Sequence, residues 1–230
     1  MRIVVSMREL TGLFGFLRKR ESHPSVFLIE NVPYYSQWES PDLVGAIIRE
    51  EISARDDLLW KKSGAKSSEE YEFWANNMCG MACLKMVLEH KLNKNVPIVE
   101  LGKECLRYGG YVLKPDTIDG LYYAPFVRFI KHEFDLDAKV VGRMSVDRIV
   151  RELAFGNYVI ASVHHEIRSP DSSAFQKGGH LVLVLGYNLE ENKLFFHNPS
   201  GDTPQNQSHA TVSFSKFKKF FAGRGIVIKK

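Results

Sequence analysis

Apolar residues cover nearly the whole circumference of one predicted helix, over residues 80–92. Only Lys85 and Glu89, spaced four apart, form a narrow polar stripe along it. A helix that is apolar almost all round belongs in a protein interior, so we expect this segment to be the central helix of the fold. Three further helices are predicted, over 99–108, 123–133 and 145–154.

The second part of the chain has the shorter period of β-strands. Strands are predicted over 158–163, 180–187 and 193–197, and more weakly over 211–214 and 226–228. Another short strand, at 25–29, ends a preface of residues 1–30 that either blocks a cleft as a propeptide or pairs with the sheet. Helices first and strands afterwards are typical of an α+β fold, not of alternating β-α-β units.

Residues 39–72 interrupt this order and are predicted to be a helical insertion within a single domain of residues 1–230. Apolar residues recur at helical spacing in the first part of the insertion, at Leu43, Ile47, Ile48 and Ile52. With the start signal at 40–42, they predict an amphipathic helix. A loop over 61–68 and a second helix from 69 to 74 are expected to follow.

The composition supports a folded domain and argues against several functions. Hydrophobic residues make up 44% of the chain and aromatic residues 12%, which is enough for a large core. The formal net charge is only +4, and no basic and aromatic pattern of a nucleic-acid module occurs. Since the chain also has no glycine-rich phosphate loop, we expect no nucleotide or other cofactor.

The three cysteines, Cys79, Cys83 and Cys105, do not form a paired framework, which favours a reducing compartment. Charges interrupt the first apolar run too early for a signal peptide, and no apolar stretch approaches membrane-spanning length. We therefore expect a cytoplasmic protein without a membrane span. Cys83 and Cys105 occupy apolar helix positions and are predicted to be core residues.

Cys79 stands where the central helix would begin. The partial positive charge of a helix N-terminus favours the thiolate form of a cysteine, and a neighbouring imidazole would favour it further. Cys79 is therefore a candidate nucleophile. On its own, it would fit a small buried residue better, as cysteines often are.

His180 opens an apolar strand directly after Gly178 and Gly179, which permit close approach of another segment. A polar ring at the end of such a strand is expected to face a cleft, so His180 is the candidate base. Asn198 follows the next strand and precedes Pro199. Its side-chain amide can accept a hydrogen bond from the imidazole and hold the useful tautomer.

A thiol acyl-transfer site also needs donors for the oxyanion. The backbone N–H of Cys79 is one candidate, and the side-chain amide of Gln37 is the other. Because Gln37 lies far upstream of Cys79, Asn76 or Asn77 is an alternative donor.

A metal site is the competing interpretation of the histidines. His164 and His165 could join His180 or His197 as ligands. Their spacing matches no strong zinc signature, so no metal is predicted.

Five segments, taken together and in this order, resemble the bacteriocin-processing peptidases. They are VPYYSQ at 32–37, CGMACLKMVL at 79–88, AFGNYVI at 154–160, GGHLVLVLGYN at 178–188 and NPSG at 198–201. These enzymes are family thirty-nine of the cysteine peptidases, within the papain-like superfamily, and the resemblance spans roughly residues 31–201. It implies a papain-like α+β fold, in which the central helix carries the nucleophile and packs on an antiparallel sheet.

The resemblance also implies a role for each candidate residue. Cys79 is the nucleophile, His180 the base, Asn198 the orienting residue and Gln37 the oxyanion donor. The bacterial relatives usually have aspartate where Asn198 stands, and an amide orients the ring without stabilising imidazolium by charge. No transporter segments accompany the domain, so cleavage coupled to export is not implied.

The predicted function is that of a thiol hydrolase that cleaves a peptide or isopeptide bond through an acyl-enzyme on Cys79. One alternative is an acyltransferase or transglutaminase-like enzyme that passes the same thioester to another acceptor. A second alternative is a catalytically inactive peptide-binding module. In each case the expected partner is a peptide or protein, not nucleic acid.

Overall fold

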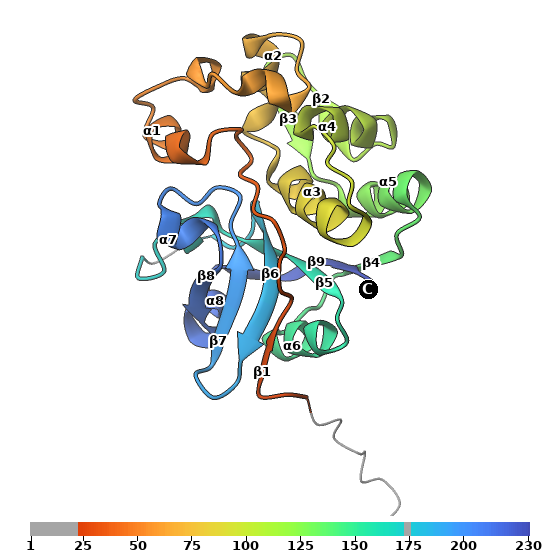
Figure 1. Cartoon of the computed structure of the whole chain (residues 1–230), viewed down its shortest axis with the longest axis vertical. Helices are drawn as coiled ribbons and strands as arrows, with labels where there is room; N and C mark the ends of the chain where they lie inside the picture. The colour runs from red at the N-terminus through yellow and green to blue at the C-terminus, as the bar shows by residue number, and fades with distance from the viewer. Residues whose placement is uncertain (1–22, 173–175) are drawn as a thin grey trace, which may run out of the picture.

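The computed structural model describes residues 23–172 and 176–230, so most of the predicted preface, residues 1–22, lies outside the described part. Its strands include β1 (Val26–Leu28), β4 (Ala138–Val141), β5 (Tyr158–Val163), β6 (His180–Asn188), β7 (Lys193–His197), β8 (Ala210–Ser213) and β9 (Phe221–Ile228). They form a seven-stranded antiparallel sheet in the order β4-β9-β5-β6-β7-β8, with β1 paired to the end of β6 (Figure 1).

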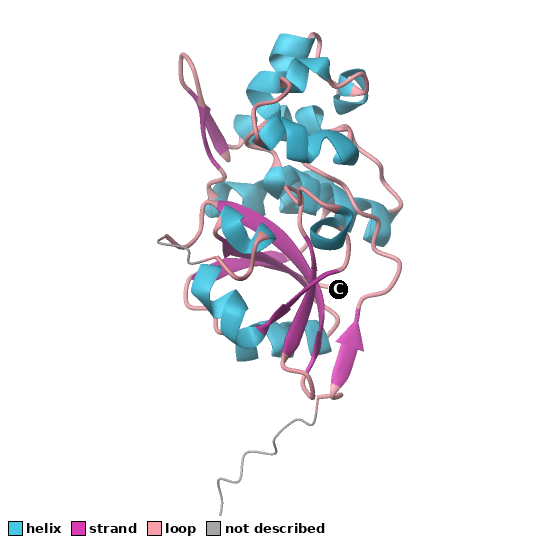
Figure 2. Ribbon diagram, turned by 90° about the vertical axis from the view of Figure 1, so that its left-hand side faces the viewer, coloured by secondary structure: helices cyan, strands magenta, loops and turns pink. Residues whose placement is uncertain are grey.

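Helices cover both faces of this sheet, which confirms the predicted α+β fold (Figure 2). One core contains α2 (Ser68–Ala75), α3 (Cys79–Leu92), α4 (Ile98–Arg107) and α5 (Tyr123–Phe134). The other core contains α6 (Val146–Ala154) and α8 (Phe214–Phe220). Within residues 23–172 and 176–230, no helix has both the length and the apolar character to cross a membrane.

β6 is buried along nearly its whole length because it lies between the two cores. Leu181, Leu183 and Leu185 belong to the core on the α3 side. Val182 and Val184 belong to the core on the opposite side. Side chains alternate between the faces of a strand, so a strand that is covered on both faces carries an unbroken apolar run.

The predicted central helix is α3, which packs on β6 and β5. Its residues 80–88 are all buried, including Lys85, whose ammonium group lies 4.4 Å from the centre of the Tyr35 ring. The helix ends where Asn93 adopts a left-handed conformation, with φ of 52°. Cys83 and Cys105 are fully buried, as expected of core residues.

Several elements differ from the sequence prediction. The strand predicted over 211–214 ends at Ser213, whose side chain accepts a hydrogen bond from the backbone N–H of Lys216 and caps α8. The hairpin of β2 (Tyr111–Leu113) and β3 (Ile118–Gly120) and the edge strand β4 were not predicted. A short helix, α7 (Pro204–Gln207), lies between β7 and β8.

The first part of residues 39–72, which we call the insertion, forms a series of short turns instead of the predicted amphipathic helix, whereas α2 confirms the helix predicted from 69 to 74. The turns are 3-10 helices at Pro41–Leu43, Ala54–Asp56 and Trp60–Ser63, with α1 (Val44–Ile48) between the first two. Glu50, with φ of 58°, directs the chain out of the helix. Ile52 therefore lies beyond α1 and not on the predicted helix.

Asp57 holds the insertion together through hydrogen bonds. Its carboxylate is fully buried and accepts from the Ser40 N–H (2.9 Å) and hydroxyl (2.6 Å), the Leu59 N–H (2.9 Å) and the Tyr71 hydroxyl (2.9 Å). Buried carboxylates require such partners to offset their desolvation. Because Tyr71 belongs to α2, these bonds also connect the turns of the insertion to the helix that leads to Cys79.

Candidate active site

Cys79 is the first residue of α3, as predicted, and its side chain is partly accessible. The chain passes from α2 to α3 through a tight turn. In it, the Asn77 N–H donates to the Trp74 carbonyl at 2.9 Å and the Met78 N–H donates to the Ala75 carbonyl at 3.3 Å. This turn fixes the direction in which the helix begins and the position of the thiol.

Backbone N–H groups near the thiol lower its pKa, but burial has the larger effect on this pKa. Burial raises the pKa of Cys79 to about 11, against the opposing effect of the N–H groups of Leu181, Gly80 and Cys79 itself. The N–H groups at the start of the helix lower the pKa of Cys79, as expected, but burial outweighs them. The Leu181 N–H also shows that the sulfur lies beside the start of β6.

His180 is the first residue of β6 and is almost completely buried. Gly178 and Gly179 precede it with φ of 89° and 92°, a conformation that side chains other than glycine rarely adopt. A Cβ on Gly178 would also lie 3.2 Å from the Ser162 hydroxyl. The two glycines therefore permit the sharp turn that delivers the imidazole to the end of the strand.

Asn198 lies directly after β7 and is hydrogen-bonded to the imidazole, the contact that its predicted orienting role requires. Its Oδ1 is 2.8 Å from Nε2 of His180, so Nε2–H donates to it and Nδ1 is left to face a reacting group. Asn198 is fully buried, and its Nδ2 has no partner among the described residues. The amide therefore serves His180 through its oxygen alone.

Ser200 is a part of this arrangement that the sequence analysis quoted within a motif but did not assign. Its hydroxyl lies 3.1 Å from Nε2 of His180, and its backbone N–H donates to Oδ1 of Asn198 at 3.3 Å. It is buried, like its two partners. The turn after β7 thus provides two groups, not one, that fix the orientation of the imidazole.

Burial lowers the pKa of His180 to about 4, although the hydrogen bond to Asn198 acts in the opposite direction. The nearby positive charge of Arg168 also disfavours imidazolium. With the pKa of Cys79 raised, the two groups are a neutral thiol and a neutral imidazole around neutral pH. An imidazole in this state can accept the thiol proton when the sulfur attacks.

Gln37 reaches the site although 41 residues separate it from Cys79 in the sequence. Its backbone N–H donates to the Pro199 carbonyl at 2.9 Å, which joins the extended segment before the insertion to the turn that carries Asn198. Its side-chain Nε2 donates to the Ala75 carbonyl at 3.0 Å. An amide nitrogen carries two protons, so this bond fixes the group and leaves a second N–H. Of the alternative donors, Asn76 also lines the cavity described next.

The candidate residues meet at one cavity of about 690 Å³. Gln37, Cys79, His180 and Ser200 all line it, while Asn198 lies behind His180. A second, smaller cavity of about 390 Å³ shares Cys79 and His180 with the first. The thiol and the imidazole therefore lie where two hollows adjoin, an arrangement that leaves room for a chain to extend on both sides of them.

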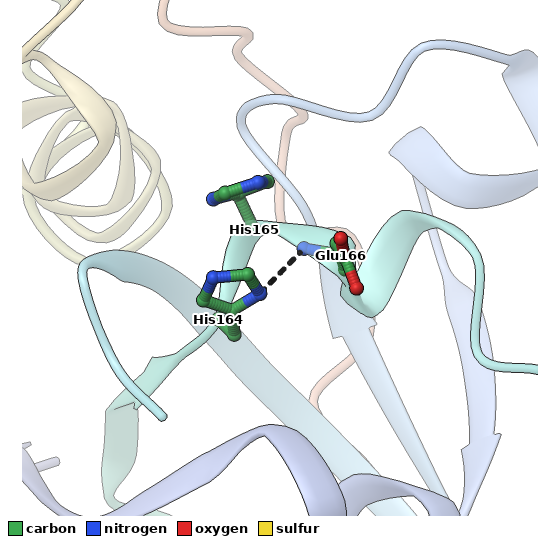
Figure 3. Close-up of side chains that lie close together, drawn as sticks. All are labelled: His164, His165 and Glu166. Carbon is green, nitrogen blue, oxygen red and sulfur yellow. Dashed lines mark hydrogen bonds between the residues drawn. The ribbon is translucent and has the colours of Figure 1, made fainter. Parts of the chain in front are cut away.

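Beside this site, His164, His165 and Glu166 form the single group of three potential metal ligands within residues 23–172 and 176–230 (Figure 3). Their donor atoms all lie within 4.8 Å of one another. The Glu166 N–H donates to Nδ1 of His164 at 3.5 Å, and the Ser172 hydroxyl donates to the Glu166 carboxylate at 3.1 Å. Neither His180 nor His197 belongs to this group.

His197 instead has a structural environment. Its Nε2–H donates to the Val32 carbonyl at 3.0 Å, and its Nδ1 accepts from the His209 N–H at 3.0 Å. Both ring nitrogens are therefore occupied in the neutral form, and burial lowers the pKa of His197 to about 4.

An α+β fold that brings a helix-terminal cysteine to one cavity with a histidine–asparagine pair has the arrangement of a cysteine-peptidase-like protein. A family profile confirms this class: it matches residues 29–226, and the chain belongs to the Peptidase_C39 like family. Family membership makes the protein a peptidase-like hydrolase. No curated protein matches the chain significantly.

Two solved structures match the chain. The first is described as a C39-like peptidase from Bacillus anthracis, with a TM-score of 0.55 and 15% identity; the match covers 89% of this chain and 98% of that one. The second is the peptidase domain of Streptococcus ComA, a bifunctional ABC transporter, with a TM-score of 0.46 and 18% identity; the match covers 67% of this chain and 93% of that one. At such identities the first match supports the fold alone.

Proposed function

We propose that the protein is a cysteine peptidase that cleaves a peptide or isopeptide bond through an acyl-enzyme on Cys79. The observation that carries the proposal is the hydrogen bond from Nε2 of His180 to Asn198. It engages Nε2, so Nδ1 is the ring nitrogen that remains for the thiol of Cys79, and both residues line one cavity. Membership of a peptidase-like family supports the same reaction class.

The reaction begins from neutral groups. As Sγ of Cys79 attacks the substrate carbonyl carbon, the thiol proton passes to Nδ1 of His180. Asn198 and Ser200 hold the resulting imidazolium in place from its Nε2 side. The negative charge on the carbonyl oxygen is stabilised by the Cys79 backbone N–H and the free side-chain N–H of Gln37.

Collapse of this intermediate breaks the carbon–nitrogen bond, and His180 gives its proton to the departing amine. The acyl group is then a thioester on Cys79. His180 next takes a proton from water, which attacks the thioester and releases the acid. The imidazolium finally returns the proton to the thiolate, which restores the neutral pair.

The proposal is tested by following a quenched-fluorescence peptide library and by mass spectrometry of the intact protein. Cys79→Ala removes the nucleophile, so cleavage is expected to fall on the order of 10⁴-fold or more. Cys83→Ala is the matched control, because it removes a buried thiol one helical turn away and leaves the cavity intact. Cleavage that survives in Cys79→Ala overturns the proposal.

The same assay separates hydrolysis from acyl transfer. Adding amine acceptors in ¹⁸O-labelled water shows whether the product acid carries the label or the acyl group appears on the amine. Label in the product supports the peptidase; an amide product without label supports the acyltransferase alternative. If the unmodified protein neither cleaves peptides nor forms an adduct with peptide aldehydes, it is the binding module.

We also infer a cytoplasmic location. All three cysteines are free thiols, which is the usual state of cysteines in a reducing compartment. Cell fractionation of the tagged protein checks this inference; recovery with secreted or membrane fractions contradicts it.

A further inference from the structure

We propose that the insertion forms a binding subsite for a bulky apolar side chain of the substrate, close to the scissile bond. This inference rests on the proposed peptidase function. It names a substrate class: peptides with leucine, isoleucine, valine, methionine or phenylalanine near the point of cleavage.

Apolar side chains form part of the lining of the cavity at Cys79 and His180, and we call this part the apolar wall. The wall consists of Ile47, Ile48, Ile52 and Ala54 from the insertion, with Trp38 directly before it. The three isoleucines are each partly exposed, so their free surface faces the hollow instead of packing entirely inside the protein. Covering this surface with an apolar group removes it from water, which is favourable.

The wall is fixed relative to the catalytic groups. The Gln207 side chain donates to the Pro41 carbonyl at 2.8 Å and to the Gly201 carbonyl at 3.0 Å. It therefore joins the first turn of the insertion to the loop that carries Asn198 and Ser200. A side chain bound against the wall would thus be held at a constant distance from the thiol, which is what a specificity subsite requires.

The cavity has room for such a ligand. Its volume of about 690 Å³ falls within the range of about 300–1,000 Å³ that is typical of ligand pockets. Polar residues line the cavity as well, among them Glu50 and Ser53 of the insertion and Arg168. This mixture of apolar and polar lining favours a peptide that presents one large apolar side chain, not a wholly apolar molecule.

Ile52 is the most informative residue to change. Ile47 and Ile48 also pack against the core on the α3 side, whereas Ile52 is not part of that cluster. A substitution at Ile52 therefore alters the wall with little effect on the fold. Leu58 is the matched control, because it lies in the same insertion, is 90% exposed and is absent from the lining of the cavity.

The experiment profiles cleavage with a positional-scanning peptide library. The unmodified protein is expected to prefer leucine over alanine on the order of 10- to 100-fold in kcat/KM at one position near the scissile bond. Ile52→Asp should abolish this preference, and Ile52→Ala should weaken it several-fold. Leu58→Asp should leave it unchanged. Equal preference in the unmodified protein and Ile52→Asp overturns the subsite.

A binding measurement distinguishes failure of the subsite from failure of the peptidase function. Dissociation constants for leucine- and alanine-containing library peptides are measured on Cys79→Ala, with and without Ile52→Asp. Cleavage without an Ile52-dependent preference overturns the subsite and leaves the peptidase standing. Binding that depends on Ile52, in a protein that cleaves nothing, supports the subsite and overturns the peptidase.

Discussion

The two sides of the cavity are built in different ways. On the sheet side, His180 lies at the start of β6, a strand embedded in both hydrophobic cores, and Asn198 follows β7, which packs in one of them. On the other side, the insertion consists of short turns whose centre is Asp57 and its polar partners. The hydrophobic core therefore positions the residues proposed for catalysis. A hydrogen-bonded segment outside the core positions the residues proposed for selectivity.

This difference suggests how catalysis and side-chain selectivity are separated in the molecule. A change in the insertion can reshape the apolar wall while β6 and α3 keep their positions. A change at the start of β6, in contrast, affects the imidazole of His180 whichever substrate is bound. Each prediction below asks whether one side can be altered without affecting the other.

The largest expected effect concerns the ionisation of the thiol. Because the pKa of Cys79 is raised to about 11, its thiolate fraction should increase about tenfold for each pH unit between 7 and 10. Alkylation of Cys79 by iodoacetamide, followed by peptide mass spectrometry, should accelerate about 10³-fold over that range. Rapid labelling near pH 7, faster than that of glutathione, would instead show a thiolate–imidazolium pair and contradict the neutral resting state.

The next effect concerns the orientation of the imidazole. Asn198→Ala removes the partner of Nε2 and should reduce kcat on the order of 10²-fold, with little change in KM. Ser200→Ala should have a smaller effect, because Oδ1 of Asn198 still holds the ring. Both variants should retain the side-chain preference in peptide profiling. A changed preference would show that the two sides of the cavity are not independent.

The complementary change is made in the insertion. Asp57→Ala leaves several buried donors without an acceptor and should lower the free energy of unfolding by about 3 kcal/mol. Urea unfolding measures the loss, and limited proteolysis should show cleavage within residues 39–72. The exposed Asp42→Ala is the control in the same segment. If Asp57→Ala is as stable as this control, the hydrogen bonds of Asp57 do not hold the insertion.

The same contrast explains which elements the sequence predicted. β6 and α3 carry long apolar runs, and burial on all sides is visible in such a pattern. The first helix of the insertion was predicted to extend to Ile52, because Ile52 continues the helical spacing. In the structure, Glu50 turns the chain away before that residue. Single left-handed residues other than glycine leave little trace in a periodic pattern.

The sequence indicated which residues form the candidate site better than it indicated their pKa values. Cys79, His180 and Gln37 line one cavity, and Asn198 bonds to His180, as the motif order indicated. The contact of Ser200 with the imidazole depends on the turn after β7, which the letters NPSG do not specify. The raised pKa of Cys79 could not be predicted, because it reflects burial by segments far apart in the sequence.

The smallest expected effect is on the pH dependence of stability, and it concerns His197, where the two sides of the cavity are joined. His197 bonds to Val32, at the start of the extended segment that carries Gln37. Its pKa is about 4 in the folded protein and about 6.5 when unfolded, so the unfolded chain binds more protons between these values. The contribution of His197 to the free energy of unfolding is therefore complete above about pH 6.5. It falls by up to about 3 kcal/mol as the pH drops to 4.

Substitution of His197 tests this contribution, since buried His180 adds a similar acid sensitivity of its own. His197→Gln removes the titrating ring, so the difference in unfolding free energy between neutral and acidic buffer should shrink by roughly 2 to 3 kcal/mol. The surface variant His132→Gln should leave the difference unchanged. An unaltered difference in His197→Gln would mean that the folded protein tolerates the protonated ring, and that the hydrogen bond from the His209 N–H to Nδ1 does not keep the ring neutral.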